Sequence, residues 1–299
     1  MFDSATTGRL GMHLMKGASR IVPRGAVDGV LGFIAGRIVS NPGSPLMRAV
    51  RTNQWVVSGE TLAGDALDAA VRANVESIAR FLYDYYHVLG NERAERELLL
   101  RDEVFDTLVE REASGGGPFV YVGAHFGNFD FVGRQLGRAG WHMQILSVPD
   151  PNAGYEWQNQ VREEVGFEVT PVSIEALKTA ARRLADGHSV LTGLDRPLEA
   201  PDKVQPLLFG RAAPLPLLHV RLAMRAGVPV VVVAAPRDPD GRYRLVASDP
   251  IPMIGTRPTP EALLANAQRC LEPVERWVFG DPAQWAMPHA VWPDVDVPR

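Results

Sequence analysis

The sequence Phe119-Val-Tyr-Val-Gly-Ala-His-Phe-Gly-Asn-Phe-Asp130 decides the fold class of this chain. Its first residues, 119–123, are apolar and of β-favouring types, which predicts a buried strand. Gly127 then allows a tight turn, and Asn128 can cap the helix expected to follow. A strand, a glycine turn and a helix in direct succession are typical of a βαβ unit, so this segment predicts an α/β fold.

The alternation of strand and helix continues along the chain. Strands are predicted at residues 119–123, 143–148, 169–172, 189–192 and 228–235. Helices are predicted at residues 128–139, 153–165, 174–187 and 216–226, and a last helix begins at Thr259-Pro260-Glu261 and runs to about residue 279. Residues 242–246 are expected to pair with strand 228–235 as an antiparallel edge. The pattern therefore predicts a mainly parallel central sheet flanked by helices.

The first part of the chain has a helical pattern instead. Helices are predicted at residues 9–21, 27–38, 62–89 and 92–112, before Ser114-Gly-Gly-Gly-Pro118 breaks the pattern. We expect an N-terminal helical segment at residues 1–112 and an α/β core at residues 118–299. The two parts are expected to pack together as one integrated domain.

Positive charge is concentrated in the N-terminal part. Residues 1–55 carry seven Lys and Arg against two Asp, a net charge of +5, and because the whole chain has a net charge of −4, the remainder carries −9. Basic amphipathic helices such as those predicted here can lie in the headgroup layer of an anionic membrane. Packing of the same helices on the protein body, with the basic residues in solvent, explains the pattern equally well. An anionic membrane surface is the predicted partner, and no nucleic acid is predicted.

Composition narrows the function classes. The 299 residues are 46% apolar and 22% charged, an ordinary globular balance. The single cysteine, Cys270, excludes an intramolecular disulfide and a thiolate metal cluster, and the seven histidines show no metal-binding spacing. We predict no metal and no cofactor. No uninterrupted run of 18 apolar residues and no signal peptide is evident, so neither a membrane span nor secretion is expected.

His125 is the candidate general base. A histidine followed five positions later by a carboxylate occurs three times, at His125/Asp130, His87/Glu92 and His289/Asp294. Only His125 leaves an apolar strand and enters a glycine turn before a helix, and sites in α/β sheets gather beyond the carboxyl ends of strands. A histidine oriented by Asp130 has the groups needed to deprotonate a hydroxyl. The alternative is a structural histidine with an ordinary acid at a helix N-terminus.

A second polar cluster follows the strand at 189–192, in Gly193-Leu-Asp195-Arg196-Pro-Leu-Glu199. Because the carboxyl ends of parallel strands share one edge of the sheet, this cluster can converge on His125. An ion-paired loop is the alternative. Arg211 comes shortly after, and arginine can bind phosphate oxygens through two hydrogen bonds.

Several of these blocks resemble a known family. Gly123-Ala-His-Phe-Gly-Asn-Phe-Asp130 is similar to the His-x4-Asp/Glu block of the lysophospholipid acyltransferase superfamily, in the branch of the lipid A lauroyl/myristoyl and phosphatidylinositol mannoside acyltransferases. Further similar blocks follow in order: Asp195-Arg196, Leu208-Phe-Gly-Arg211, Ala223-x3-Gly227-Val-Pro-Val, and Asp281-Pro-Ala-Gln-Trp285 through Val291-Trp-Pro-Asp294. The resemblance covers nearly the whole chain.

The resemblance implies transfer of an acyl chain from acyl-CoA or acyl carrier protein to a hydroxyl of a glycolipid or phospholipid, at the cytoplasmic face of the cell membrane. His125 would be the general base, Asp130 would orient it, and no covalent enzyme intermediate would form. The implied substrate-binding residues are Gly127, Asn128, Arg162, Asp195, Arg196, Glu199 and Arg211. The N-terminal helices are interrupted by charges, which favours peripheral attachment. A non-catalytic lipid-binding or acyl-CoA-binding protein and an acyl-thioester hydrolase remain the alternative functions.

Overall fold

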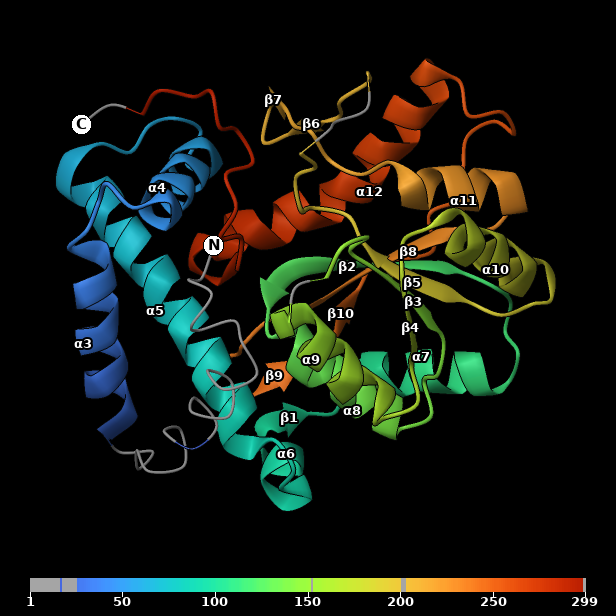
Figure 1. Ribbon diagram of the computed structural model, residues 1–299, viewed down its shortest axis with the longest axis horizontal. Helices are drawn as coiled ribbons and strands as arrows, with labels where there is room; N and C mark the ends of the chain where they lie inside the picture. The colour runs from blue at the N-terminus through green and yellow to red at the C-terminus, as the bar shows by residue number, and fades with distance from the viewer. Residues whose placement is uncertain (1–16, 18–25, 152, 200–202, 298–299) are drawn as a thin grey trace.

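A computed structural model describes residue 17 and residues 26–151, 153–199 and 203–297 of the chain (Figure 1). In these residues the central sheet has six strands in the order β10-β8-β2-β5-β3-β4. The strands are β2 (Val120–Gly127), β3 (Gln144–Ser147), β4 (Glu168–Pro171), β5 (Val190–Gly193), β8 (Val230–Ala235) and β10 (Val246–Ala247). All neighbours pair in parallel except β10, which pairs antiparallel with β8. The predicted α/β fold with a mainly parallel sheet is confirmed.

Helices cover both faces of the sheet, and the predicted helices after residue 128 are confirmed. They are α8 (Phe129–Arg138), α9 (Ala153–Glu163), α10 (Ile174–Ala185), α11 (Leu218–Ala226) and α12 (Pro260–Gly280). Side chains of α10, α11 and α12 join one hydrophobic core with Val120 and Val122 of β2. Side chains of α8 join the other core with Tyr121, because successive strand residues point to opposite faces.

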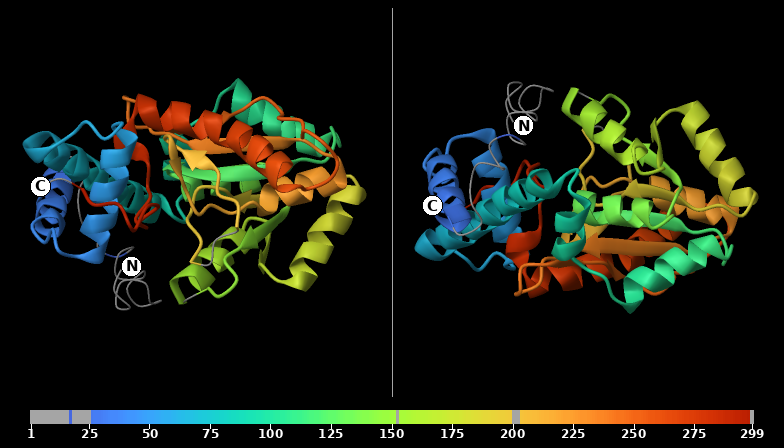
Figure 2. Two further views of the ribbon diagram at one scale, coloured as in Figure 1. Left: turned by 90° about the horizontal axis from the view of Figure 1, so that it is seen from above. Right: turned by 90° about the horizontal axis from the view of Figure 1, so that it is seen from below.

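The N-terminal helices form a layer beside the sheet. Its members are α3 (Val27–Val39), α4 (Pro45–Val57) and α5 (Gly64–Val88), and Figure 2 shows them together on one side of the molecule. The helices predicted at 27–38 and 62–89 are confirmed as α3 and α5, whereas the helix predicted at 9–21 lies outside the described residues. Helix α4 was not predicted. It begins at Ser44, whose side chain accepts a hydrogen bond from the amide of Met47.

The prediction of one helix over residues 92–112 is wrong. The chain forms α6 (Glu92–Leu98), β1 (Leu99–Leu100) and α7 (Glu103–Ala113). The break has a local cause, because the Asp102 side chain caps α7 by accepting from the amide of Phe105. It also has a tertiary cause, because β1 pairs in parallel with β9 (Tyr243–Arg244).

The edge predicted at residues 242–246 is confirmed in part. Val246 and Ala247 of β10 pair antiparallel with β8, as expected. Residues 243–244 pair in parallel with β1, outside the central sheet, and Tyr243 also forms an isolated antiparallel bridge with Arg237 beyond the end of β8. The antiparallel edge is therefore shorter than the pattern predicted.

A segment near the C-terminus connects the helical layer to the sheet. We call residues 281–292 the C-terminal strap; it includes the short helix η2 (Pro282–Gln284). Asn74 of α5 donates hydrogen bonds to the carbonyls of Ala283 and Trp285, at 3.0 and 2.9 Å. Asn53 of α4 holds the other end of the strap, for example by accepting from the amide of Val291 at 3.1 Å. The helical layer and the α/β core are thus joined by buried polar contacts.

None of the helices within the described ranges is both long and apolar enough to cross a bilayer.

Candidate active site

His125 lies where β2 leaves its regular pairing. The register between β2 and β8 shifts between Gly123 and Gly127, so the backbone groups of His125 are available to other partners. Its amide donates to Asp195 Oδ2 at 3.0 Å, and its carbonyl accepts from the amide of Ala286 at 2.7 Å. The end of β2 is therefore held by the loop after β5 on one side and by the C-terminal strap on the other.

Asp195 orients the His125 ring. Its Oδ1 lies 2.7 Å from His125 Nδ1, and its Oδ2 accepts from the Trp285 indole Nε1 at 3.0 Å. Asp195 is completely buried, which alone would raise the pKa of its carboxyl group, but the charge of His125 and the hydrogen bonds from His125 and Trp285 lower that pKa below its usual value. Asp195 is therefore an ionised partner for the ring.

The paired carboxylate leaves the other ring nitrogen free for chemistry. A proton on Nδ1 faces Asp195, so Nε2 carries a lone pair. No hydrogen bond within the described part of the chain involves Nε2. The side chain of His125 is 24% exposed. The ring of Phe129 packs edge-on against the imidazole, with 4.9 Å between the ring centroids. A general base needs such a partly exposed imidazole with a free ring nitrogen.

The partner of His125 differs from the sequence-based expectation, which was Asp130. The Asp130 carboxylate forms an ion pair with Arg162 at 2.6 Å and accepts a hydrogen bond from Gln158 at 3.4 Å. The reason is the start of α8: Asp130 lies in its first turn and pairs with side chains of the neighbouring α9. Asp195, which the position at a strand end predicted to converge on His125, makes the orienting contact.

Gly127 and Asn128 have backbone roles next to the site. Gly127 has a φ of 74°, and a Cβ there would meet the carbonyl oxygen of Ala235 at 1.9 Å, so only glycine fits. Asn128 is the predicted helix cap: its side chain accepts from the amide of Phe131 and donates to the carbonyl of Phe81 at 2.9 Å. Substrate binding by these two residues stays a prediction.

The remaining predicted substrate-binding residues do not all gather at His125. Arg196 hydrogen-bonds to the hydroxyl of Tyr155 and lies over its ring at 5.0 Å. Arg211 forms an ion pair with Glu60 and lies over the Trp55 ring of α4 at 5.8 Å. Glu199 is exposed. Of this group, Arg196 is the one directly beside Asp195, and substrate binding by all three stays a prediction.

Two residues of the C-terminal strap belong to the site and were not predicted. Trp285 donates to Asp195, although its sequence block had been noticed without a role. His289 lies outside the helices and strands and is half-buried. Burial, together with the positive charges of Arg196 and His125, lowers the pKa of His289 to about 4, so its imidazole is neutral at ordinary pH. The signal in the sequence was tryptophan and histidine within one short Pro-rich segment.

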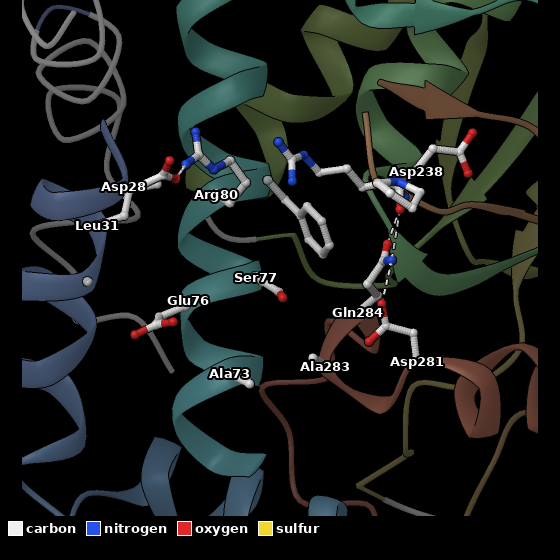
Figure 3. A pocket seen from close by; sticks show the side chains of 14 residues that line it. Asp28, Leu31, Ala73, Glu76, Ser77, Arg80, Asp238, Asp281, Ala283 and Gln284 are labelled. Carbon is white, nitrogen blue, oxygen red and sulfur yellow. Dashed lines mark hydrogen bonds and ion pairs between the residues drawn. The ribbon is translucent and has the colours of Figure 1, made fainter. Parts of the chain in front are cut away.

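A polar cleft of about 510 Å³ lies behind this strap, between α3, α5 and residues 237–239 and 281–284 (Figure 3). Arg80, Arg237 and four carboxylates line it, whereas none of the predicted site residues does. Figure 3 shows Gln284 between Asp281 and the loop at Asp238, with the hydrogen bonds that fix it. Within the described ranges, no group of three His, Cys, Asp or Glu side chains is arranged to hold a metal ion.

The fold and the buried His125–Asp195 pair define an α/β protein with a candidate general base at the carboxyl edge of its sheet. The family model described as bacterial lipid A biosynthesis acyltransferase matches residues 10–293. No curated protein sequence gives a significant match. The chain therefore belongs to the bacterial lipid A biosynthesis acyltransferase family, and it is an acyltransferase enzyme that acts on a lipid acceptor.

Proposed function

We propose that His125 is the general base for direct acyl transfer from a thioester to a lipid hydroxyl. The observation that carries this proposal is the 2.7 Å contact between His125 Nδ1 and Asp195 Oδ1. It holds the ring in the tautomer whose Nε2 can accept a proton, and it stabilises the imidazolium that results. Base catalysis of this kind contributes roughly 10²–10⁴-fold to a rate.

In the proposed step the acceptor hydroxyl attacks the thioester directly, and no covalent enzyme intermediate forms. Nε2 of His125 removes the proton of the acceptor hydroxyl while the oxygen attacks the thioester carbonyl carbon. The ester C–O bond forms, the C–S bond breaks, and the thiolate leaves. The imidazolium then returns its proton to the thiolate, which restores neutral His125 and releases a free thiol. The step needs no metal and no cofactor.

The proposed donor is acyl-CoA or acyl carrier protein, and the proposed acceptor is a glycolipid or phospholipid of the phosphatidylinositol mannoside or lipid A type. Family membership supports a lipid acceptor. Arg162, paired with Asp130, and Arg196, hydrogen-bonded to Tyr155, offer guanidinium groups for polar groups of either substrate.

We propose peripheral attachment at the cytoplasmic face of the cell membrane. Helix α3 supports it, because Phe33, Ile34 and Val30 expose 71%, 42% and 37% of their surface. Arg37 lies in the last turn of the same helix, where it can contact anionic headgroups. An exposed apolar face beside a basic residue is compatible with a helix that lies in the membrane interface.

The test is acyl transfer by His125→Ala. Palmitoyl-CoA and palmitoyl-acyl carrier protein serve as donors, and anionic vesicles with a phosphatidylinositol mannoside or a lipid A precursor supply the acceptor. Thiol release and mass spectrometry of the lipids give the rate. We expect a fall of at least about 10²-fold with an unchanged circular dichroism spectrum. Near-normal turnover would refute the mechanism, and equal thiol release without acceptor would indicate a hydrolase.

Two asparagine substitutions distinguish the carboxylates in the same assay. Asp195→Asn should lower kcat by about 10²-fold or more, because it removes the charge that stabilises the imidazolium. Asp130→Asn should cost less, since its carboxylate is paired with Arg162 and not with the base. The reverse order would restore the role that the sequence assigned to Asp130.

A further inference from the structure

The candidate base and its carboxylate are contacted by a third side chain, the indole of Trp285. Its Nε1–H lies 3.0 Å from Asp195 Oδ2, the carboxylate oxygen that does not face the imidazole. Trp285 is 1% exposed, and most buried indole N–H groups have a hydrogen-bond partner. Here the partner is a fully buried carboxylate, so the contact is charge-assisted and resists exchange with water.

Both the backbone and the ring of Trp285 are fixed by contacts with other elements. The backbone of Trp285 forms a β-bridge with Phe126, and the next amide, of Ala286, donates to the carbonyl of His125 at 2.7 Å. The carbonyl of Trp285 accepts from Asn74 of α5 at 2.9 Å. The ring itself packs edge-on against Phe209, with 5.5 Å between centroids. Trp285 is therefore placed relative to His125 by contacts independent of Asp195.

This placement has two consequences for Asp195. First, Oδ2 accepts from both the indole and the amide of His125, so the carboxylate cannot rotate about its Cβ–Cγ bond without losing both hydrogen bonds, and Oδ1 stays directed at Nδ1 of His125. Second, the indole withdraws part of the negative charge from the carboxylate, which weakens its pull on the imidazolium. The strength of the base is set by both effects.

We propose that Trp285 is a positioning residue of the active site, which fixes the orientation of Asp195 and sets the pH above which His125 is a base. The inference rests on the proposed function of His125. It assigns to the C-terminal strap a part in the chemistry and not only in the packing.

The other ionisable groups around His125 are neutral or have partners of their own. Burial lowers the pKa of His289 of the strap to about 4, so this side chain is neutral at ordinary pH. Arg196 is hydrogen-bonded to the hydroxyl of Tyr155. On the α8 and α9 side, Asp130 and Arg162 are paired with each other.

The test is the pH dependence of kcat/KM for Trp285→Phe, which keeps an apolar ring and removes the N–H. Thiol release from palmitoyl-CoA is measured with one acceptor, a phosphatidylinositol mannoside or a lipid A precursor, whichever the unmodified chain acylates faster. Without the indole, Asp195 stabilises the imidazolium more strongly, so the acid limb should move to higher pH by about 0.5–1 unit. Maximal kcat/KM should fall about tenfold, while KM changes less than about twofold because Trp285 is buried.

Trp292→Phe is the matched control. Trp292 is buried, its ring centroid lies 6.4 Å from that of Trp285, and its Nε1 has no hydrogen-bond partner within the described ranges. The substitution makes the same change in size at the adjacent ring and removes no hydrogen bond. We expect an acid limb at the same pH as in the unmodified chain.

An acid limb that stays in place in Trp285→Phe would overturn the inference, and so would a uniform loss of rate equal to that of Trp292→Phe. The proposed function would survive that result if His125→Ala were inactive in the same assay. A double-mutant cycle gives a second criterion. In the Asp195→Asn background, Trp285→Phe should cost little more, because its effect passes through Asp195, whereas an undiminished further loss would contradict the proposal.

A measurement on the unmodified chain covers the case in which Trp285→Phe does not fold. The indole N–H signal of Trp285 in a ¹⁵N-tryptophan NMR spectrum is assigned by substituting the other tryptophans one at a time. It should shift with pH along the same midpoint as the acid limb of kcat/KM. A signal insensitive to pH across that range would refute the coupling.

Discussion

Two buried titratable side chains of this protein, Asp195 and His219, differ in whether they have hydrogen-bond partners. Asp195 is completely buried, yet it accepts hydrogen bonds from the amide and ring of His125 and from Trp285, which together compensate the loss of water. His219 of α11 is 2% exposed, and neither ring nitrogen has a hydrogen-bond partner within the described ranges. Burial lowers the pKa of His219 to about 4, so it is neutral at ordinary pH.

The low pKa of His219 in the folded state predicts that the free energy of unfolding depends on pH. Above pH 6.5 the side chain is neutral in both folded and unfolded states. As the pH falls from 6.5 towards 4, the unfolded state takes up the proton first, so stability is lost. At pH 5 the loss should be about 2 kcal/mol relative to pH 7.5. It is measured as the difference in urea unfolding free energy between the unmodified chain and His219→Leu, since other groups titrate equally in both. An equal pH dependence in the two chains would contradict this assignment.

At the scale of the element, α3 has one buried and one exposed apolar face. Val27, Leu31 and Ala35 are buried, while Phe33 on the outer face is 71% exposed. An exposed phenylalanine in the interior of a helix gains nothing from folding alone. The membrane interface is the environment in which it would contribute.

We therefore expect Phe33→Ser to weaken binding to anionic phospholipid vesicles by about tenfold, the loss of one buried apolar side chain. Co-sedimentation with vesicles of phosphatidylglycerol measures it. Ile174→Ser is the matched control, because Ile174 is 73% exposed on α10, which Figure 1 shows at the opposite end of the molecule from α3. Equal effects of the two substitutions would exclude α3 as the membrane-binding face.

At the scale of the whole molecule, the helical layer and the α/β core depend on each other. Asn74 is 1% exposed and donates to the carbonyls of Ala283 and Trp285, and Tyr243 of the sheet side donates to Asp84 of α5 at 2.7 Å. Such contacts across the layers support unfolding as one unit, in line with the proposal of one integrated domain.

Substitution of Asn74 by leucine tests whether the helical layer and the α/β core unfold together. It leaves buried carbonyls of the C-terminal strap unsatisfied, so the free energy of unfolding should fall by about 2–4 kcal/mol. Calorimetry should show one transition in both chains, with a lower midpoint in Asn74→Leu. The control, Asn91→Ala, removes only the exposed cap of α6 and should cost about 1 kcal/mol. Two separate transitions would mean that the helical layer is an independent domain.

Local features of the sequence were enough to predict most of the elements. The strand at 119–123, the turn at Gly127 and the cap at Asn128 each depend on residues that are close together in the sequence. The sequence alone therefore predicts them. The single helix predicted at 92–112 was wrong because the pairing of β1 with β9 joins residues far apart in the chain. Helix α4 was missed although Ser44-Pro45 is a recognisable start.

The sequence by itself therefore determined the α/β fold, the place of His125 at a strand end, and Asp195 as a group that could reach it. Tertiary structure alone decided which carboxylate pairs with the ring. Asp130 is five residues from His125 but pairs with Arg162 of the next helix, whereas Asp195 is 70 residues away and hydrogen-bonded to His125. It also brought Trp285 to the same carboxylate from 90 residues further along. The physical reason is that side-chain direction depends on how layers pack, and spacing along a chain carries no information about packing between distant segments.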